Sequence, residues 1–503
     1  MDSEGRLKEA FEFLSSVNKR AYRDTLLISN QVLSKNPCNN NFLNHLLRGK
    51  QPRRHGLCAI ALRVIIYYFK SALHFGVYLV KFAEYFASGL HNEAAQAKGC
   101  LTVIDIPFLL DKIRGQGHFT DCYLPGLEDV LKRKGRPYAY YPNFYYSKLP
   151  FQLYGIFKIL KRDKVPLICE YQLLKALDLF SLLWFIIVYP FRVLGFAFKL
   201  SPADYLSRLL KAELLDTLSQ VTFQGFSRYL QARRLASLGY SEIKLISWYE
   251  NLALNKNFYR GLRSENSAIK IYGAKLSIYS RNFISEIADE NEAAFGVVPD
   301  KIIVNGKYFM PSMSAINYSI GPSLRFRKLL ESSFNSDGQT DILVLLPYFK
   351  EEAKNILRLV SDSGLAERNV VIKAHPATPL KNLACRLPSW MSVSEGDTYK
   401  LFEHSNVVIG AASGTLLEAA SLGIPAISVM NPGRFDYNNP LPDYGRGVIW
   451  DSAVSGKDLR DKVAQLEKNR ETRRGELMSL ASAYKDMFFS PVTADKIIEV
   501  FEL

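Results

Sequence analysis

The sequence predicts an α/β protein of two domains, each built on a parallel sheet flanked by helices. The chain has 503 residues, which is too long for one hydrophobic core. Its 48% hydrophobic and 22% charged content is typical of a folded globular protein. From Thr340 onward, short β-branched runs alternate with helical periodicity, which favours parallel strands joined by crossover helices. We expect an N-terminal domain over residues 1–322 and a C-terminal domain over 323–503.

In the C-terminal domain, apolar runs predict four strands, and two segments of helical periodicity predict crossover helices. The helices are EEAKNILRLVSDSG, which ends at a glycine, and GTLLEAASLG. Ligands of such Rossmann-like sheets bind outside the carboxyl ends of the strands. The four strands are expected at 341–347, 369–376, 405–413 and 424–429.

Ser413, Gly414 and Thr415 open a helix directly after a predicted strand. Free backbone N–H groups, two hydroxyls and the positive end of the helix dipole make this position an anion site. Gly414 permits a close backbone approach. A plain helix cap is the alternative interpretation of the same residues.

The neighbouring strand end carries Lys373, His375 and Pro376. Lys373 and His375 supply donors for a base, a ribose or a phosphate, and Pro376 ends the strand at a turn. Glu418, one turn after Gly414, is placed to reach a ribose hydroxyl. Taken alone, His375 would be a structural histidine. Two such groups at successive strand ends of one sheet predict a nucleotide site.

The segment 341–429 resembles a known group of enzymes. Lys373-Ala374-His375-Pro376, then Ser413-Gly414-Thr415 with Glu418-Ala419, Gly423 and Pro425, is similar to GT-B glycosyltransferases of bacterial surface polysaccharides. The group includes sialyl- and polysialyltransferases, Kdo transferases of capsule and O-antigen assembly, and teichoic-acid glycerophosphotransferases. The resemblance implies two Rossmann-like domains facing a cleft, with His375, Pro376, Ser413 and Thr415 on a CMP or CDP donor. Nucleotide-sugar 2-epimerases share a similar strand-to-helix pattern.

The N-terminal domain has the same α/β character. Runs at 101–110, 136–143, 246–251 and 301–306 predict strands, and DYLSRLLKAELLDTLSQ predicts a helix. The linker is expected within 310–323, which is rich in Ser, Pro and Gly. Trp248-Tyr249-Glu250-Asn251 resembles a W-x-E-N-Q motif of surface-carbohydrate biosynthesis proteins. Leu252 replaces its Gln, and Ala274-Lys275 replaces the Gln-His of a later G-x-Q-H motif.

An inverting transfer needs a general base on the acceptor hydroxyl. Glu250 is the first candidate because it follows a predicted strand, and its alternative is an acid bonded near a helix start. His118 and Asp121, in RGQGHFTDCY, are further candidates, with a surface loop as the alternative. Lacking a D-x-D motif and any His or Asp cluster, the chain is expected to use no metal, and no cofactor besides its nucleotide-sugar substrate. Lys373 and Arg434 are expected to help stabilise the leaving phosphate.

Two apolar segments, about 59–90 and 176–200, are additions to this domain. In the first, four basic residues fall within about 20° of one line along a helix. A cationic stripe on an apolar helix favours an interfacial helix on anionic lipid, supported by Arg48, Lys50, Arg53 and Arg54 upstream. Buried core helices and a true span, which Pro190 and a short apolar stretch disfavour, are the alternatives. The four stripe residues are Arg63, Lys70, His74 and Lys81.

The formal charge of +15 favours polyanionic partners such as anionic lipid or a phosphorylated substrate. No nucleic-acid motif accompanies it, so nucleic acid is not an expected partner. Six scattered cysteines and an N-terminus without an apolar signal region indicate a reducing cytoplasm. We therefore expect a cytoplasmic protein, peripheral on the inner face of the cell membrane.

Three functions fit these features. The first is a glycosyltransferase that moves a CMP-activated acidic sugar, Kdo or a sialic-acid relative, onto a lipid-linked surface glycan. The second is a CDP-alcohol phosphotransferase of the teichoic-acid type. The third is a catalytically diminished GT-B-like binding protein, which the missing Gln and His favour.

Overall fold

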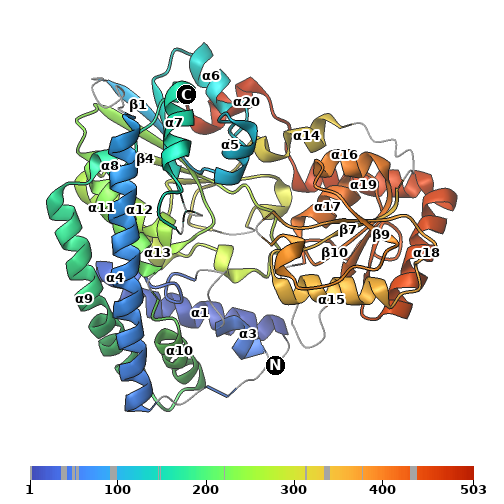
Figure 1. Ribbon diagram of the computed structural model, residues 1–503, viewed down its shortest axis with the longest axis horizontal. Coiled ribbons are helices and arrows are strands. Elements are labelled where there is room, and N and C mark those ends of the chain that lie inside the picture. The colour runs from blue at the N-terminus through green and yellow to red at the C-terminus, as the bar shows by residue number, and fades with distance from the viewer. Residues whose placement is uncertain are drawn as a thin grey trace.

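The computed structural model contains two parallel six-stranded sheets, side by side along the long axis of the molecule (Figure 1). Both carry helices on their faces, so the α/β, GT-B prediction of two Rossmann-like domains is confirmed. The structure describes residues 3–35, 42–47, 51–52, 56–90, 99–144, 147, 149–219, 221–311, 314–332, 340–376, 378–430 and 439–503.

The N-terminal sheet has the strand order β2-β1-β3-β4-β5-β6, with parallel pairing throughout. The four strands expected from apolar runs are present, as β1, β2, β3 and β5. β6 was not expected, because three half-buried residues carry no periodicity. The strands are β1 (Cys100–Pro107), β2 (Tyr138–Asn143), β3 (Glu242–Trp248), β4 (Lys270–Ala274), β5 (Lys301–Val304) and β6 (Tyr318–Ile320).

Helices of this domain flank the sheet and its C-terminal loops. α11 packs extensively on α12 across one face of the sheet. Their bounds are α1 (Ser3–Ala21), α2 (Thr25–Ile28), α3 (Phe42–Leu47), α5 (Leu110–Gln116), α6 (Leu127–Arg133), α7 (Tyr154–Arg162), α8 (Glu170–Leu173), α10 (Tyr205–Asp216), α11 (Thr222–Ala236), α12 (Ala253–Glu265) and α13 (Glu290–Ala294).

The C-terminal sheet has the order β12-β11-β10-β7-β8-β9. The four predicted strands are β7 (Thr340–Leu345), β8 (Val370–Lys373), β10 (Ser405–Gly410) and β11 (Ala426–Val429). The edge strands β9 (Met391–Val393) and β12 (Trp450–Ala453) were not expected, because each is short and lacks a β-branched run. The helices are α14 (Arg327–Glu331), α15 (Lys350–Ser361), α16 (Thr398–His404), α17 (Gly414–Ser421), α18 (Gly456–Thr472) and α19 (Arg474–Phe488).

The last helix, α20 (Ala494–Phe501), returns to the N-terminal domain. Its Ile497, Val500 and Phe501 are buried in the same core as residues of β1 and β5. Glu502 then pairs with Lys301 of β5, 2.8 Å from nitrogen to oxygen. The boundary predicted at residue 323 placed this helix in the C-terminal domain, and the structure corrects that assignment. An amphipathic helix alone does not reveal which of two sheets it covers.

The two apolar segments form long helices, α4 (Leu57–Ser88) and α9 (Ala176–Phe198), on the outside of the N-terminal domain. By length and composition, both could cross a membrane. Only 11% of the most apolar window of α4 is buried, and 33% of that of α9. The alternative that both helices are buried in the core is therefore wrong. Arg48, Lys50, Arg53 and Arg54 lie outside the described residues.

Candidate functional site

The carboxyl ends of the two sheets meet near β4 and β10. A Cβ atom placed on Gly414, after β10, would lie only 2.9 Å from the Cβ of Ile278, after β4. The close approach that Gly414 permits is thus to the other domain, rather than only to a ligand. A glycine here lets the two loops touch. The predicted nucleotide-site residues and the candidate base therefore belong to facing loops.

Arg325 connects the two halves of this site. It lies in a short 3-10 turn, Leu324–Phe326, just after the last strand of the N-terminal sheet. Its Nη1 donates to the Leu276 carbonyl at 3.3 Å, and the guanidinium side chain is exposed. The positive charge acts on the carboxyls of Glu250 and Glu418 from opposite domains. It also helps lower the pKa of His375, after burial. No motif around Arg325 indicated this role.

Glu250 follows β3 and is half-buried at this junction. Burial and the neighbouring Glu286 raise its pKa to about 7, against the opposing charges of Arg325 and Lys275. A carboxyl that titrates near neutral pH suits general-base catalysis, because it is both available and able to accept a proton. General-base catalysis by Glu250 stays a prediction.

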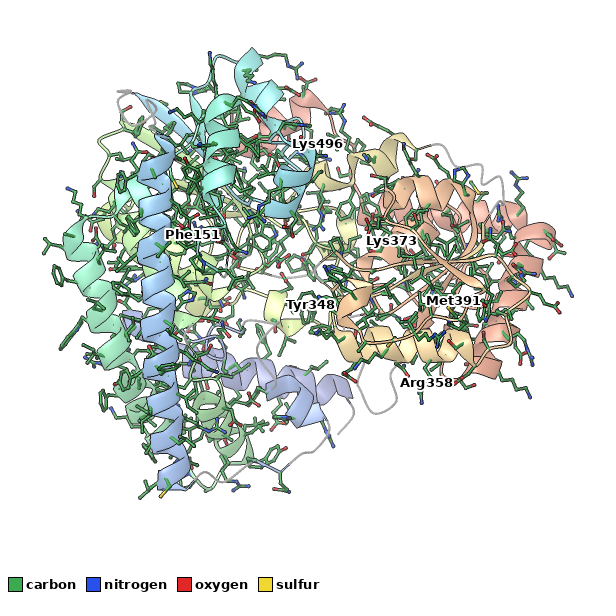
Figure 2. The ribbon with its side chains drawn as sticks, viewed as in Figure 1. Phe151, Tyr348, Arg358, Lys373, Met391 and Lys496 are labelled. Atoms are coloured by element: carbon green, nitrogen blue, oxygen red, sulfur yellow. The ribbon has the colours of Figure 1, made fainter. Side chains whose placement is uncertain are left out.

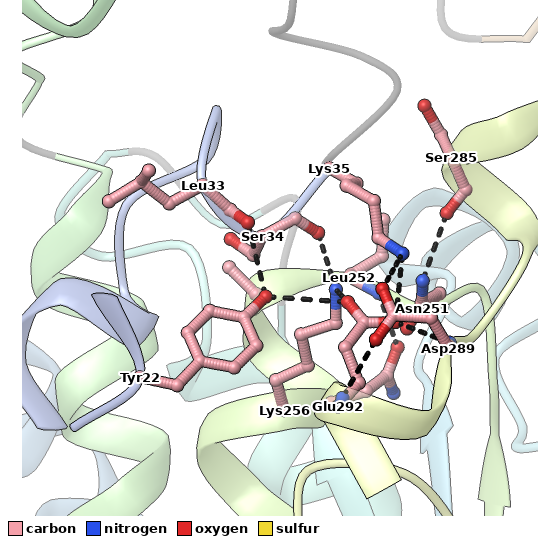
Figure 3. Close-up of polar contacts among 12 residues, drawn as sticks. Tyr22, Leu33, Ser34, Lys35, Asn251, Leu252, Lys256, Ser285, Asp289 and Glu292 are labelled. Carbon is pink, nitrogen blue, oxygen red and sulfur yellow. Dashed lines mark hydrogen bonds and ion pairs between the residues drawn. The ribbon is translucent and has the colours of Figure 1, made fainter. Parts of the chain in front are cut away.

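A buried charge cluster fixes the loop that carries Glu250 (Figure 3). Lys35 pairs with Asp289 at 3.1 Å and with Glu292 at 2.9 Å, and Lys256 pairs with Glu292 at 2.6 Å. Burial opposes ionisation of Glu292, but the two ammonium groups prevail and lower its pKa to about 2. The adjoining Asn251 adopts φ 53° and donates to the Ser285 carbonyl at 3.1 Å. These contacts hold the backbone on either side of Glu250.

Lys275 occupies the position where the resemblance implies an imidazole. Its ammonium lies 2.6 Å from the Glu286 carboxylate and 4.4 Å from the centre of the Tyr279 ring. Both members of this pair are buried. Lys275 thus holds Glu286 beside Glu250. Leu252, in place of the expected Gln, is buried at the start of α12.

On the C-terminal side, Ser413 begins α17 without capping it. The side chain makes no hydrogen bond to the first amides of the helix. A serine in extended geometry at this position normally makes that bond. Ser413 and Thr415 are both half-buried. The structure therefore does not support the plain-cap interpretation, and it leaves the Ser413 hydroxyl available to a ligand at the positive end of the helix.

His375 and Pro376 form the neighbouring loop after β8. The His375 carbonyl accepts from the Thr378 amide at 2.8 Å, which closes a tight turn around the exposed Pro376. The Tyr348 ring meets the imidazole edge to face, 5.7 Å between centres. Burial, then Arg325, lowers the pKa of His375, so its imidazole is neutral at physiological pH. A neutral imidazole can both donate and accept.

Lys373 and Glu418 already have partners. Lys373 and Tyr348 lie on the side of the C-terminal domain that faces the N-terminal domain (Figure 2). The Lys373 ammonium donates to the Gly396 carbonyl at 2.5 Å, toward the loop after β9. Glu418 accepts from the Tyr399 hydroxyl at 2.6 Å, and burial raises its pKa. Tyr399 was not among the predicted residues, since nothing in the sequence relates it to Glu418.

The other two candidate bases differ in position. The Asp121 carboxylate accepts from the amides of Tyr123 at 2.8 Å and Leu124 at 2.9 Å, closing its own turn. That turn places the Tyr123 ring 5.7 Å from the Arg325 guanidinium, so Asp121 supports the site indirectly. His118 is exposed and pairs with the Gln116 carbonyl at 3.1 Å. The structure does not bring His118 together with the other candidate site residues. Arg434 lies outside the described residues.

A separate pocket opens in the N-terminal domain between α4, α8 and α11. Its cavity volume is about 50 Å³, room for a few water molecules, and the space beyond it opens to solvent. Its charges are balanced: Arg228 pairs with Asp105 at 2.7 Å, and Lys81 lies near Glu170. The buried Nε of Arg228 has no hydrogen-bond partner. Further lining residues are His74, Tyr78, Asn143, Tyr171, Ser227 and Gln231.

Comparisons with known proteins find likeness only in solved structures. No family model matches the chain, and no curated protein does. MurG of Acinetobacter baumannii is 11% identical, with a TM-score of 0.40 over 80% of this chain and 99% of its own. S. aureus MnaA with UDP is 11% identical, with 0.44 over 80% and 95%. The wall teichoic acid polymerase TagF is 12% identical, with 0.41 over 87% and 96%. Likeness at this level carries no information on what the chain binds or transfers.

Proposed function

We propose that this chain is a glycosyltransferase that uses a cytidine-nucleotide sugar. The observation that carries the proposal is the position of Arg325, whose charge acts on Glu250 in one domain and on His375 and Glu418 in the other. A guanidinium between a poised base and a helix N-terminus fits a reaction that releases a phosphate. The motif resemblance at His375-Pro376 and Ser413-Thr415 supports cytidine as the base.

In the proposed reaction, the donor phosphate lies at the start of α17, against the hydroxyls of Ser413 and Thr415. An acceptor hydroxyl oxygen attacks the anomeric carbon, and the bond from that carbon to the phosphate oxygen breaks. Glu250 takes the acceptor proton, and CMP leaves with the bonding electrons. The α17 dipole and Arg325 stabilise the charge that develops on the phosphate. A Kdo-like or sialic-acid-like sugar fits the basic character of the chain, +15 overall.

A saccharide acceptor would meet polar side chains beneath α4. Since each of its cations faces a carboxylate, a charged ligand would gain no uncompensated partner there. Hydroxyls of a sugar can instead bond to the carboxylate, amide and guanidinium groups that line it. The unpartnered Nε of Arg228 needs one such acceptor oxygen. The lipid-linked glycan expected from the sequence combines this chemistry with a membrane location.

Thermal shifts with CMP, CDP and UDP test the proposal. We expect CMP and CDP to raise the melting temperature of the chain, with the shift reduced in Ser413→Ala and His375→Ala. Ser392→Ala, on the short edge strand β9, is the matched control that keeps the full shift. No shift with any nucleotide would overturn the proposal, and a shift with UDP alone would remove the cytidine assignment.

Donor specificity then separates the two enzymatic candidates. A CDP-alcohol phosphotransferase shares the nucleotide site but breaks the phosphoanhydride bond, so CMP leaves and a phosphoalcohol is transferred. Mass spectrometry of products from a CMP-sugar and from a CDP-alcohol distinguishes the two mass increments. A chain that binds CMP and turns over neither donor would be the diminished binding protein that Leu252 and Lys275 favour.

A further inference from the structure

Helix α4 has the reverse of the usual surface pattern. Its fully buried residues each carry a hydroxyl, an ammonium or a carboxyl group, whereas most of its large apolar side chains are exposed, with Phe75 and Phe82 half-buried against the core. Leu57 is 81% exposed, Ile65 63% and Phe69 67%. A helix at a protein–water boundary buries its apolar stripe instead. The buried set is Tyr67, Ser71, Tyr78, Lys81, Glu84, Tyr85 and Ser88.

The polar face of α4 is attached to the rest of the domain. Glu84 accepts the amides of Phe151 at 2.8 Å and Leu153 at 2.7 Å, just before α7. The Lys81 ammonium donates to the Ser147 carbonyl at 2.5 Å, and Arg63 pairs with Asp216 at 2.5 Å. These contacts correct the prediction that the basic stripe faces lipid. Lys81 is buried, while Arg63 and His74 are half-buried against the domain, so of the four stripe residues only Lys70 is exposed.

Helix α9 extends the same surface. Leu177 is 72% exposed, Phe180 67% and Trp184 63%, and further apolar residues continue to its C-terminal end. The two helices are joined, because the Tyr68 hydroxyl of α4 donates to the Ile187 carbonyl of α9 at 2.8 Å. A patch of this extent exceeds what a soluble monomer usually exposes. We call the exposed apolar side chains of α4 and α9 the outer face: Leu57, Leu62, Ile65, Ile66, Phe69, Leu73, Leu79, Phe86, Leu177, Phe180, Leu183, Trp184, Ile187, Phe191 and Phe198.

The charges of the outer face have one sign. Every residue of α4 and α9 is described, and their exposed charged side chains are the cations Lys70 and Arg192, the second of which pairs with Asp24 of the preceding segment at 3.7 Å. Their two acids are turned inward, since Glu84 and Asp178 are buried. Asp178 pairs with Arg234 of α11 at 2.8 Å. Cations around an apolar surface complement anionic lipid headgroups.

We propose that the outer face of α4 and α9 is a monotopic membrane-binding surface, inserted in one leaflet of an anionic bilayer. Crossing the bilayer would detach each helix from the domain and expose Lys81, Glu84 and Asp178 to hydrocarbon, which is costly. A protein partner is less suited, because interfaces carry polar rims and paired hydrogen bonds, and the outer face offers little besides apolar side chains. At about 1.5 Å per residue, α4 runs about 48 Å, long enough to lie along a membrane plane.

This surface does not depend on the transfer chemistry, and Trp184 provides a probe for it. Vesicles of phosphatidylcholine with phosphatidylglycerol should blue-shift the emission of Trp184, and a Trp184→Phe variant should lose the shift. Lipids brominated near the headgroup end of the acyl chain should quench Trp184 more than lipids brominated near its terminal methyl. Strong quenching by both brominated lipids would indicate a helix that crosses the centre of the bilayer. That result would overturn the monotopic arrangement.

Vesicle co-sedimentation tests which residues carry the binding. Ile65→Glu with Phe69→Glu should weaken binding at least tenfold, because two charges enter the inserted surface. Val454→Glu, at a 60% exposed apolar site in the C-terminal domain, is the matched control and should bind like the wild type. Lys70→Glu should weaken binding to anionic vesicles by about fivefold and leave neutral vesicles unaffected. Nucleotide thermal shifts should stay unchanged in all variants, so a failure here is distinct from a failure of the proposed function.

Two results would overturn the proposal. If Ile65→Glu with Phe69→Glu binds vesicles as well as the wild type, the outer face is not the membrane contact. If the wild type is a dimer by analytical ultracentrifugation, with Trp184 already shielded from acrylamide and insensitive to vesicles, a second copy covers the face. Circular dichroism melting confirms that each variant is folded, which is expected because the substituted residues are exposed.

Discussion

The two halves of the candidate site are built in different ways. On the C-terminal side, each ligand group comes from a strand end and the turn that follows it, as His375 does after β8 and Ser413 after β10. On the N-terminal side, the properties of Glu250 depend on residues far away in the chain, among them Glu286, Lys275 and Arg325. Groups that bind a ligand can thus come from one short segment. A carboxyl with a shifted pKa instead depends on charged groups from several segments.

The buried charge cluster belongs to the N-terminal half of the site. A substitution there should have the largest effect on stability. Lys256→Met leaves Glu292 with one ammonium partner, Lys35, in a fully buried setting, and the free energy of unfolding should fall by about 3–5 kcal/mol. Urea denaturation measures the loss. Lys350→Met, an exposed site at the start of α15, should change stability by less than about 0.5 kcal/mol. Equal effects at both positions would mean that the cluster does not hold the loop.

Glu250→Gln removes the proposed base and keeps its shape. The rate of transfer from a CMP-activated sugar should fall by about 10²- to 10⁴-fold, while the CMP thermal shift stays the same. Glu395→Gln, an exposed site, serves as the control. If the rate is unaffected, the base lies elsewhere and the N-terminal half of the comparison fails.

Arg325→Ala should affect both halves together. Loss of the charge that stabilises the leaving phosphate lowers the rate by about 10²- to 10³-fold. Because Arg325 lowers the pKa of Glu250, its removal should also move the acidic limb of the pH–rate profile to higher pH. Arg325→Lys should restore the position of that limb. A lower rate with an unshifted limb would show that Arg325 does not act on Glu250.

The raised pKa of Glu250 also predicts a dependence of stability on pH. The folded state holds its proton up to about pH 7, whereas the unfolded side chain loses it near its ordinary value of 4.5. Stability from this group is therefore complete below pH 4.5 and is lost as the pH rises toward 7. Glu250→Gln should remove that loss, so that at pH 8 the variant is more stable by on the order of 1–2 kcal/mol after solvent screening. Thermal melts at pH 5 and pH 8 would show whether the difference appears only at the higher pH.

The smallest expected effect tests whether the Ser413 side chain binds a ligand or caps α17. Since the Ser413 side chain makes no capping bond, Ser413→Ala should leave the melting temperature of the free protein unchanged. CMP affinity should fall by roughly two- to tenfold, the value of one hydrogen bond. Thr493→Ala, which removes a genuine cap of α20, should cost about 1 kcal/mol and leave CMP binding intact. The opposite pattern would make Ser413 a structural cap.

The sequence alone determined the α/β class and which strand ends carry the C-terminal candidate residues. Strands such as β7, β8 and β10 carry continuous β-branched runs, and their ends are adjacent in any parallel sheet, so His375 and Ser413 could be related to each other. β6 and β9 could not be found, because three residues are too few for a periodic signal. Glu250 was found by its place after a strand, without any indication of its raised pKa.

The tertiary structure alone decided which surfaces face outward and which charges meet. The stripe of basic residues along α4 is visible in the sequence, yet its partners, such as Asp216, Ser147 and Glu170, lie in other segments. Helical periodicity shows that a helix has two faces, and it cannot show which one the rest of the chain covers. The same holds for Arg325, because electrostatic interaction depends on distance in space and not on separation along the chain.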